Sequence, residues 1–460
     1  MRAFSSEAIQ NSRFIVVYLV MESINKKQSV ILFFGDIIVF FATLWLTLFV
    51  RYGELPDSSV LQVHLFPFSL LFVVWIGIFF IAGLYEKQTV GIQSRLPAVL
   101  FNAQLINSAI AITFFYLIPF FGIAPKVNLF IYLIISLVLL FIWRTYVARL
   151  FGSGRRRNAV FIGSGEELRE LVEEIHNNKR YGIDAASVID LEAIQLEKMV
   201  QELPEEIRRK KISLIIADLN DRRVEILMPY FYTLIFSNIQ VANMHKVYED
   251  IFNRVPLSLV TYEWFVENIS IVSKSAYDVV KRAMDFVVAV VATPVSLVVY
   301  PFVYVAIKYD DGGPLFFIDT RVGKRGKIIH IHKFRSMTVD GQKITRAGAI
   351  LRKTRIDELP QLWSVLRGDQ SLIGPRPERP QYVEQYRKEI KHYDIRLLIA
   401  PGLSGWAQIY HDNHPHFAME TDATKEKLSY DLYYIKHRSL LLDVVIALKT
   451  LKILLLWKGK

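Results

Sequence analysis

The first third of the chain alternates long apolar runs with short polar connections. Four runs are long enough to cross a bilayer, whose hydrocarbon core takes about 20 helical residues. They are Val30–Val50, Leu65–Leu84, Leu96–Phe121 and Leu129–Leu150. This pattern predicts a membrane protein with a four-helix transmembrane bundle over residues 1–150.

Basic residues are distributed unevenly between these runs. The connection Arg51–His64 contains one arginine against Glu54 and Asp57, whereas Arg144–Arg157 is strongly basic. Because cytoplasmic connections carry an excess of Lys and Arg, we expect the N-terminus and the residues after 150 to lie in the cytoplasm. Asp36 lies inside the first run, where an ionisable side chain is either functional or faces the bundle interior or the interface.

The composition becomes typical of a soluble domain after Arg157. Asn158–Gly163 and Ile212–Ala217 are predicted to be buried strands, and Glu166–Asn177 is predicted to be a helix. We therefore expect a Rossmann-like α/β domain over residues 151–270. The turn Gly163-Ser164-Gly165 is typical of a dinucleotide loop, but Leu168 stands where close helix packing needs a very small residue. Cofactor binding and a degenerate scaffold or regulatory domain both remain open.

A fifth apolar run, Ala283–Ile307, contains Pro294 and Pro301. Each proline removes a backbone donor, so a sharp bend is expected. Basic residues flank the run on both sides, which favours a re-entrant helix over 281–308 that returns to the cytoplasmic face. A fifth span with a proline kink is the alternative.

The rest of the chain is soluble and locally basic, and residues 271–460 are predicted to form an α-rich α+β domain. A hairpin is expected through Gly323–Gly326. The last apolar helix, Leu440–Trp457, has Lys449 and Lys452 on one face. This suits a helix lying in the membrane interface, although a helix packed against the soluble core is equally compatible with the pattern.

Composition narrows the chemistry. The chain has no cysteine, which excludes disulfides, thiolate metal sites and a cysteine nucleophile. Its net charge of +11 indicates a polyanionic partner, which could be nucleic acid, anionic lipid or a phosphorylated substrate.

Three basic clusters surround one pair of carboxylates, Asp357 and Glu358. The clusters are Lys333–Met337, Leu351–Leu362 and Ser371–Pro377. Adjacent helical side chains point about 100° apart, so one acid could attack phosphorus while the other holds a divalent metal. The alternative is that Asp357 caps a helix and Glu358 lies in its first turn.

Arg376 lies between Pro375 and Pro377. The two prolines stiffen the backbone on both sides, and a guanidinium on a rigid mount suits phosphate recognition. An incidental arginine on a surface loop is the alternative.

These clusters, together with Gly402-Leu403-Ser404-Gly405-Trp406-Ala407-Gln408, resemble the bacterial sugar transferase family of large monotopic phosphoglycosyl transferases. The resemblance covers about Lys281–Lys460, and the preceding membrane runs and α/β domain resemble the large members. It implies transfer of sugar-1-phosphate from a UDP-sugar to undecaprenyl phosphate, with release of UMP, to prime exopolysaccharide, capsule or O-antigen synthesis.

The resemblance also implies residue roles. Asp357 would attack the β-phosphorus and carry the phosphosugar, and Glu358 would bind Mg²⁺ or assist proton transfer. Lys333, Arg352 and Arg376 would hold phosphates, whereas Arg335, Lys353 and Arg355 are weaker candidates because basic side chains near a membrane often contact lipid headgroups. Asp357 and Glu358 are the expected Mg²⁺ ligands.

The expected partners are UDP-sugar, undecaprenyl phosphate and membrane lipids, without nucleic acid, in the bacterial inner membrane. A homodimer is an open expectation. His411, His414 and His416 depart from the Asn/Gly-rich stretch common in the family, and an exposed loop is a simpler explanation for them than a metal site.

Two rival functions remain. A membrane-anchored nucleotide-sugar dehydratase or epimerase would need a Tyr-x-x-x-Lys pair beside a working dinucleotide loop, and Tyr304 with Lys308 lies instead at the end of the fifth apolar run. A non-catalytic scaffold of polysaccharide assembly is the other, and the intact Asp357, Glu358 and Arg376 argue against it.

Overall fold

The computed structural model describes residues 30–85, 96–118, 125–152, 156–178, 181–193, 196–234, 236–237, 239–269, 275–410 and 421–455. The chain divides into two compact units, Met1–Val247 and Tyr248–Lys460. It is mostly helical, and five of the described helices are long and apolar enough to cross a membrane.

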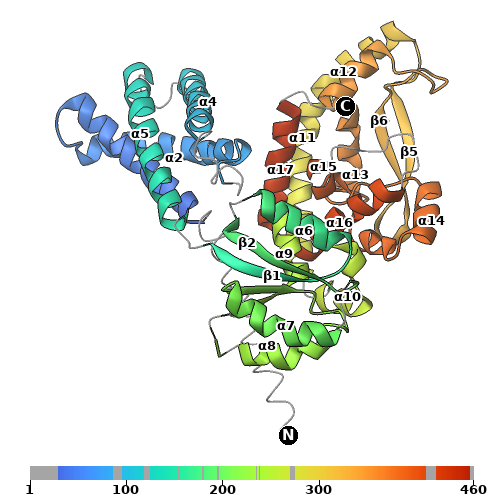
Figure 1. Ribbon diagram of the computed structural model, residues 1–460. Helices are drawn as coiled ribbons and strands as arrows, with labels where there is room; N and C mark the ends of the chain where they lie inside the picture. The colour runs from blue at the N-terminus through green and yellow to red at the C-terminus, as the bar shows by residue number, and fades with distance from the viewer. Residues whose placement is uncertain are drawn as a thin grey trace. The chain divides into compact units, whose positions relative to one another are not determined.

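Four of these five helices lie in the first unit, at the positions that the hydrophobic pattern predicts. They are Val30–Tyr52, α2 (Ser58–Ile81), α4 (Leu96–Leu117) and α5 (Pro125–Gly152) (Figure 1). Side chains from all four meet in one hydrophobic cluster that includes Phe40, Trp75, Leu100 and Leu140. The helices themselves are confirmed, and their assembly as a transmembrane four-helix bundle stays a prediction.

Asp36 faces the interior of this cluster rather than its surface. Its side chain is fully buried, forms an ion pair with Arg144 and accepts a hydrogen bond from the Tyr85 hydroxyl at 2.7 Å. Arg144 also donates to the Leu84 carbonyl at 2.8 Å. Because the carboxylate is paired, it links the first helix to α5, which agrees with the bundle-facing alternative.

An α/β layer follows the membrane helices. Its strands are β1 (Arg157–Gly163), β2 (Ile183–Asp190), β3 (Leu214–Ala217) and β4 (Gln240–Asn243), all parallel in the order β2-β1-β3-β4. The accompanying helices are α6 (Glu166–Asn177), α7 (Leu196–Arg209), η3 (Glu225–Leu227), α8 (Met228–Leu234) and α9 (Met244–Phe252). Parallel strands alternating with helices confirm the α/β class, and the Rossmann-like assignment stays a prediction.

The turn after β1 differs from the dinucleotide motif in the packing around it. Gly165 has φ +87°, so the glycine is needed there. However, Leu168 is 2% exposed and packs inward from α6, and a Cβ on Gly163 would come within 3.0 Å of the Met244 sulfur. Apolar side chains therefore occupy the region beside this turn.

The second unit carries the remaining elements. They are η4 (Leu257–Leu259), α10 (Tyr262–Asn268), α11 (Ser275–Asp310), β5 (Phe316–Val322), η6 (Lys324–Gly326), β6 (Ile328–Phe334), α12 (Arg346–Thr354), η7 (Ile356–Gln361), α13 (Leu362–Arg367), β7 (Ser371–Ile373), α14 (Pro380–Glu389), η8 (Tyr393–Leu398), β8 (Gly402–Ser404), α15 (Trp406–Tyr410), α16 (Thr421–His437) and α17 (Leu440–Leu455). Strands β5 and β6 form the predicted antiparallel hairpin. Strands β7 and β8 pair in parallel.

Residues 248–269, which the sequence pattern placed in the α/β domain, fall in the second compact unit. Val255, Trp264 and Phe265 belong to the same hydrophobic cluster as Trp406 and Leu432. No local pattern shows this packing, because Trp406 and Leu432 lie more than 140 positions away along the chain.

Helix α11 continues from Ser275 to Asp310 through both Pro294 and Pro301. Its N-terminal part is fixed to the soluble elements: Arg282 donates to the carbonyls of Val365 at 2.5 Å and Leu366 at 2.8 Å. Asp285 accepts from the Ser371 hydroxyl at 2.7 Å. The re-entrant path of α11 stays a prediction, and its attachment to α13 and β7 is a finding.

Helix α17 has one buried side and one exposed apolar side. Ile446 and Asp443 are at most 1% exposed and pack in the core, whereas Leu441 is 71% and Leu451 is 48% exposed. One face is therefore a core face. The other is an open apolar face, and its location in the membrane interface stays a prediction.

Candidate active site

A left-handed residue produces the turn that presents the carboxylate pair. Helix α12 ends at Thr354, and Arg355 has φ +58° and ψ +15°, which reverses the chain into the 3₁₀ turn η7. Asp357 and Glu358 lie in the first turn of η7, and neither is the N-cap residue of a helix. The helix-cap alternative for Asp357 is therefore not what the structure contains.

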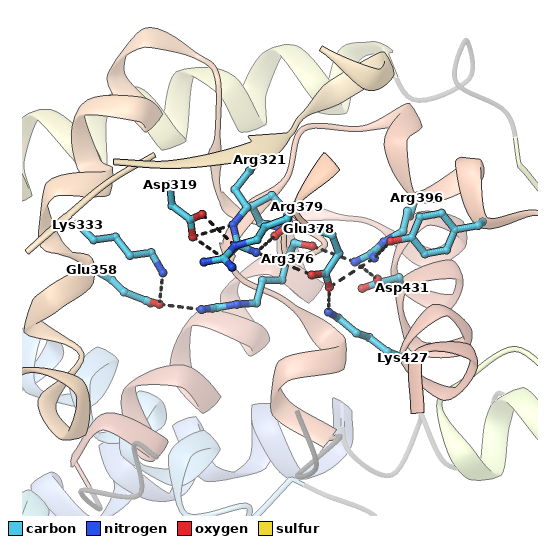
Figure 2. Close-up of polar contacts among 12 residues, drawn as sticks. Asp319, Arg321, Lys333, Glu358, Arg376, Glu378, Arg379, Arg396, Lys427 and Asp431 are labelled. Atoms are coloured by element: carbon cyan, nitrogen blue, oxygen red, sulfur yellow. Dashed lines mark hydrogen bonds and ion pairs between the residues drawn. The ribbon is translucent and has the colours of Figure 1, made fainter. Parts of the chain in front are cut away.

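Glu358 gathers three cations from three parts of the chain. Its Oε1 lies 2.9 Å from Arg376, 3.4 Å from the Lys333 Nζ and 3.7 Å from Arg355 (Figure 2 shows the first two). Burial alone would raise the pKa of Glu358, but the charges on Arg376, Lys333 and Arg355 outweigh it and hold that pKa well below its usual range. Glu358 is therefore a permanently ionised anchor for these side chains.

Asp357 has the opposite environment. It is 8% exposed, and its Oδ1 has no hydrogen-bond partner among the described residues. Burial, and then the negative charge of Glu358, raise the pKa of Asp357 to about 6, although Lys333, Arg355 and Arg352 act in the other direction. A buried carboxylate without a donor is poorly solvated, which suits a nucleophile or a metal ligand.

The predicted phosphate-binding residues differ in their positions. Lys333 and Arg376 converge on Glu358. Arg352 instead donates from Nε to the Ser336 hydroxyl at 2.8 Å. Arg355, a weaker candidate from sequence, is the third cation at Glu358. The sequence does not reveal this position, because it depends on the left-handed conformation of Arg355.

Arg335 has a structural role away from the carboxylate pair. It is 7% exposed, donates to the Pro314 carbonyl at 2.8 Å and pairs with Asp311. This fixes the start of the β5–β6 hairpin. The candidate metal loop with His411, His414 and His416 lies outside the described residues.

A pocket opens beside Glu358. One part of its lining is charged and comes from Arg355, Glu358 and Arg376. The rest is mainly apolar, with a few neutral polar groups: Leu359, Leu362, Leu403, Ser404, Gln408, Ile409, Thr450, Ile453 and Leu454. The pocket can therefore receive a ligand with a phosphorylated end and an apolar or neutral end.

The described residues contain no group of three or more His, Asp or Glu side chains spaced to hold a metal. The predicted ligands, Asp357 and Glu358, form a pair of carboxylates. Mg²⁺ commonly binds one or two carboxylates together with substrate phosphates, so a pair is a sufficient protein contribution.

The model of the family described as bacterial sugar transferase matches residues 276–457, which contain every residue of this site. A putative undecaprenyl-phosphate N-acetylgalactosaminyl 1-phosphate transferase of Bacillus subtilis is 41% identical over 133 residues, or 74% of its length. The chain belongs to the bacterial sugar transferase family.

Two further relatives of this sugar transferase show how the match is distributed. An uncharacterized sugar transferase of Bacillus subtilis is 32% identical over 192 residues, or 90% of its length and 39% of this chain. The UDP-N-acetylgalactosamine-undecaprenyl-phosphate N-acetylgalactosaminephosphotransferase of Aeromonas hydrophila is 41% identical over 198 residues, or 40% of this chain. That match spans 46% of the Aeromonas protein, so less than half of its length is shared.

Proposed function

We propose that this sugar transferase moves a sugar-1-phosphate from a UDP-sugar to undecaprenyl phosphate and releases UMP. The observation that carries the proposal is the unpartnered Oδ1 of Asp357 beside the three cations at Glu358. The neighbouring Glu358 lines a pocket with an apolar wall. A nucleophile next to phosphate-binding cations and such a pocket suits a reaction between a nucleotide sugar and a lipid phosphate. The names of the Aeromonas phosphotransferase and of the putative Bacillus 1-phosphate transferase support the same reaction class.

In the first step, a carboxylate oxygen of Asp357 attacks the β-phosphorus of the UDP-sugar. The bond between that phosphorus and the bridging oxygen breaks, UMP leaves with the oxygen, and the phosphosugar remains on Asp357. Lys333, Arg355 and Arg376 would balance the charge that accumulates on the phosphate oxygens. Their positions around Glu358 hold them ready before substrate arrives.

In the second step, a phosphate oxygen of undecaprenyl phosphate attacks the same phosphorus. The acyl phosphate bond breaks, the Asp357 carboxylate is regenerated, and the product is a sugar diphosphate lipid. Two displacements let two large substrates use one site in turn. The pocket wall of Ile453 and Leu454 would contact the first part of the lipid chain.

Mg²⁺ fits this site as a proposed cofactor. The unpartnered Oδ1 of Asp357 is a suitable ligand, whereas Oε1 of Glu358 already faces three cations. Bound together with the diphosphate, the ion would neutralise charge on the leaving group. Glu358 would contribute its other carboxylate oxygen to the ion, while Oε1 holds the surrounding cations.

The proposal includes the location of the reaction. The chain would reside in the bacterial inner membrane, with a four-helix transmembrane bundle, a Rossmann-like cytoplasmic domain and a re-entrant α11. Basic flanks on both sides of α11 support the same-face return, since positive residues favour the cytoplasm. The catalytic unit would then meet soluble UDP-sugar and lipid phosphate at one surface.

The proposal also includes a homodimer. Mass photometry of the full chain in nanodiscs would measure its oligomeric state.

The test uses the full chain in nanodiscs with Mg²⁺, a panel of UDP-sugars and undecaprenyl phosphate. UMP release is expected with at least one sugar, and Asp357→Asn should abolish it. In the absence of lipid, labelled UMP should exchange into UDP-sugar, because the covalent step is reversible. The exposed Asp422→Asn serves as the matched carboxylate control and should behave as wild type.

Different results would contradict different parts of the proposal. UMP release that persists in Asp357→Asn would reject Asp357 as nucleophile. Release that requires lipid, without any exchange in its absence, would reject the covalent intermediate in favour of direct transfer. Oxidation or epimerisation of the sugar without UMP release would favour the dehydratase or epimerase alternative.

A further inference from the structure

The loop that carries Arg376 has every backbone carbonyl from Pro375 to Glu378 engaged. At its two ends the donors are backbone amides: Gly402 donates to the Pro375 carbonyl at 2.9 Å and Val322 donates to the Glu378 carbonyl at 2.9 Å. Pro375 and Pro377 have no N–H, so the loop has few amides of its own with which to be held. The fixation of its centre must therefore come from side chains.

Arg396 holds the centre of the loop from η8. One of its terminal nitrogens donates to the Arg376 carbonyl at 2.9 Å, and the other donates to the Tyr393 hydroxyl at 2.8 Å. The same guanidinium lies 2.8 Å from Asp431 Oδ2. The Arg396 and Asp431 side chains are 3% and 2% exposed, so the fork is fixed in orientation on several sides.

Arg321 holds the next carbonyl from β5. It donates to the Pro377 carbonyl at 3.0 Å, and its Nε donates to Asp319 at 2.9 Å. Asp319 also lies 3.2 Å from Arg379, at the end of the loop. Figure 2 shows Arg321 and Arg396 approaching the loop from two different directions.

The loop also contributes an anion to this arrangement. Glu378 pairs with Lys427 of α16 and lies 3.8 Å from both Arg396 and Arg321. Buried ion pairs give little net stability, because desolvation offsets most of their attraction. Here the two arginines end on the carbonyls of the loop, so their contacts fix a backbone conformation.

We propose that Arg396 and Arg321 are positioning residues that act through Arg376: they clamp the two carbonyls that set where the Arg376 guanidinium points. The proposal rests on the proposed phosphosugar transfer. Arg376 reaches Glu358 at 2.9 Å and lines the pocket, so a small backbone shift moves a phosphate-binding group. A displacement of about 1 Å can cost on the order of 100-fold in rate.

The first arm of the test is a charge-conserving substitution in the full chain. Arg396→Lys keeps a cation beside Asp431 but cannot reach Asp431, Tyr393 and the Arg376 carbonyl together. We expect kcat/KM for UDP-sugar to fall on the order of 10- to 100-fold. Arg321→Lys, at a less buried position, should lower activity in the same direction. It tests the proposal even if Arg396→Lys fails to fold.

Arg387→Lys is the matched control. Arg387 pairs with Asp394 in the same part of the chain, but both side chains are exposed, at 43% and 61%. Its activity should stay within about 2-fold of wild type, as expected for an exposed ion pair.

The second arm distinguishes positioning from a general structural role. If Arg396 acts through Arg376, then Arg396→Lys should add less than about 3-fold to the loss already caused by Arg376→Ala, because residues acting as one unit are non-additive. Independent losses that multiply in the double variant would overturn the proposal. So would wild-type activity in both Arg396→Lys and Arg321→Lys.

The third arm is independent of the reaction. Hydrogen–deuterium exchange of a peptide covering 371–379 should become faster in Arg396→Lys and remain unchanged in Arg387→Lys. If wild type releases no UMP from any UDP-sugar, the proposed function fails while this arm still tests the clamp. Unchanged exchange in both lysine variants of the clamp would overturn it.

Discussion

Asp357 and Glu358 are consecutive in the chain but differ in their electrostatic surroundings. Glu358 Oε1 lies within 4 Å of Arg376, Lys333 and Arg355, whereas Asp357 Oδ1 has no hydrogen-bond partner among the described residues. The cations thus hold one carboxylate in its ionised form, and burial raises the pKa of the other to about 6. This asymmetry separates an anchor from a reactive group.

The first prediction is an acid limb in the pH dependence of the reaction. Only ionised Asp357 can attack phosphorus, so kcat/KM should fall tenfold per pH unit below about 6. In Glu358→Gln the limb should move to lower pH, because the neighbouring negative charge that helps to raise the pKa of Asp357 is gone. UMP-exchange rates measured between pH 4.5 and 8 would check both statements. A limb that stays near pH 6 in Glu358→Gln would contradict the assignment of that charge as a cause.

The second prediction concerns stability. The pKa of folded Asp357 lies above its unfolded value of 3.8, so the folded state binds more protons between these values and stability falls as pH rises through that window. Above pH 6 the cost is at most about 3 kcal/mol. Asp357→Asn should therefore raise the unfolding temperature at pH 8 in EDTA, and the gain should vanish near pH 4. A gain that is independent of pH would indicate another cause.

The sequence predicts the elements of this protein better than the contacts between them. Apolar runs of spanning length locate the membrane helices, since the bilayer sets a length that few soluble segments reach. The pairing of β5 with β6 follows from the turn residues between them. Both features depend on neighbouring positions in the chain.

The site depends on long-range contacts and on one backbone conformation. Basic clusters around Asp357 indicate phosphate chemistry, but nothing in the sequence distinguishes Arg355, in its left-handed conformation, from Arg352. Arg396 reaches the Arg376 carbonyl across 20 positions of chain that include helix α14. No periodic pattern encodes such a contact, because it follows from tertiary packing.

The third prediction concerns Asp443, which links α17 to α11. It is 1% exposed and accepts from the Tyr277 hydroxyl at 2.7 Å, the Lys281 Nζ at 3.0 Å and the Tyr434 hydroxyl at 2.7 Å. Asp443→Asn leaves Lys281 without its counter-charge, which should cost about 3 kcal/mol. Thermal unfolding in nanodiscs would show a lower midpoint.

The control for Asp443 is Asp369→Asn, which removes an ion pair whose Lys327 side chain is 73% exposed. An exposed pair is screened by water, so little change in the midpoint is expected. Equal shifts in Asp443→Asn and Asp369→Asn would show that the contacts of Asp443 contribute no more than a surface pair.

The last prediction separates the two substrates by means of the pocket wall. Ile453 lies in α17, on the apolar side of the pocket that has Glu358 and Arg376 on its charged side. A UDP-sugar needs the charged side, whereas the isoprene units of the lipid need the apolar side. Ile453→Ser removes apolar contact worth about 1–2 kcal/mol, so KM for undecaprenyl phosphate should rise about 5- to 30-fold. UMP exchange without lipid should stay within about 2-fold of wild type, because the first displacement does not involve the lipid.

Leu441→Ser, on the exposed face of the same helix, is the control for a general effect on membrane attachment. Equal losses in exchange and in lipid-dependent transfer for Ile453→Ser would show that this wall supports the whole site rather than the lipid.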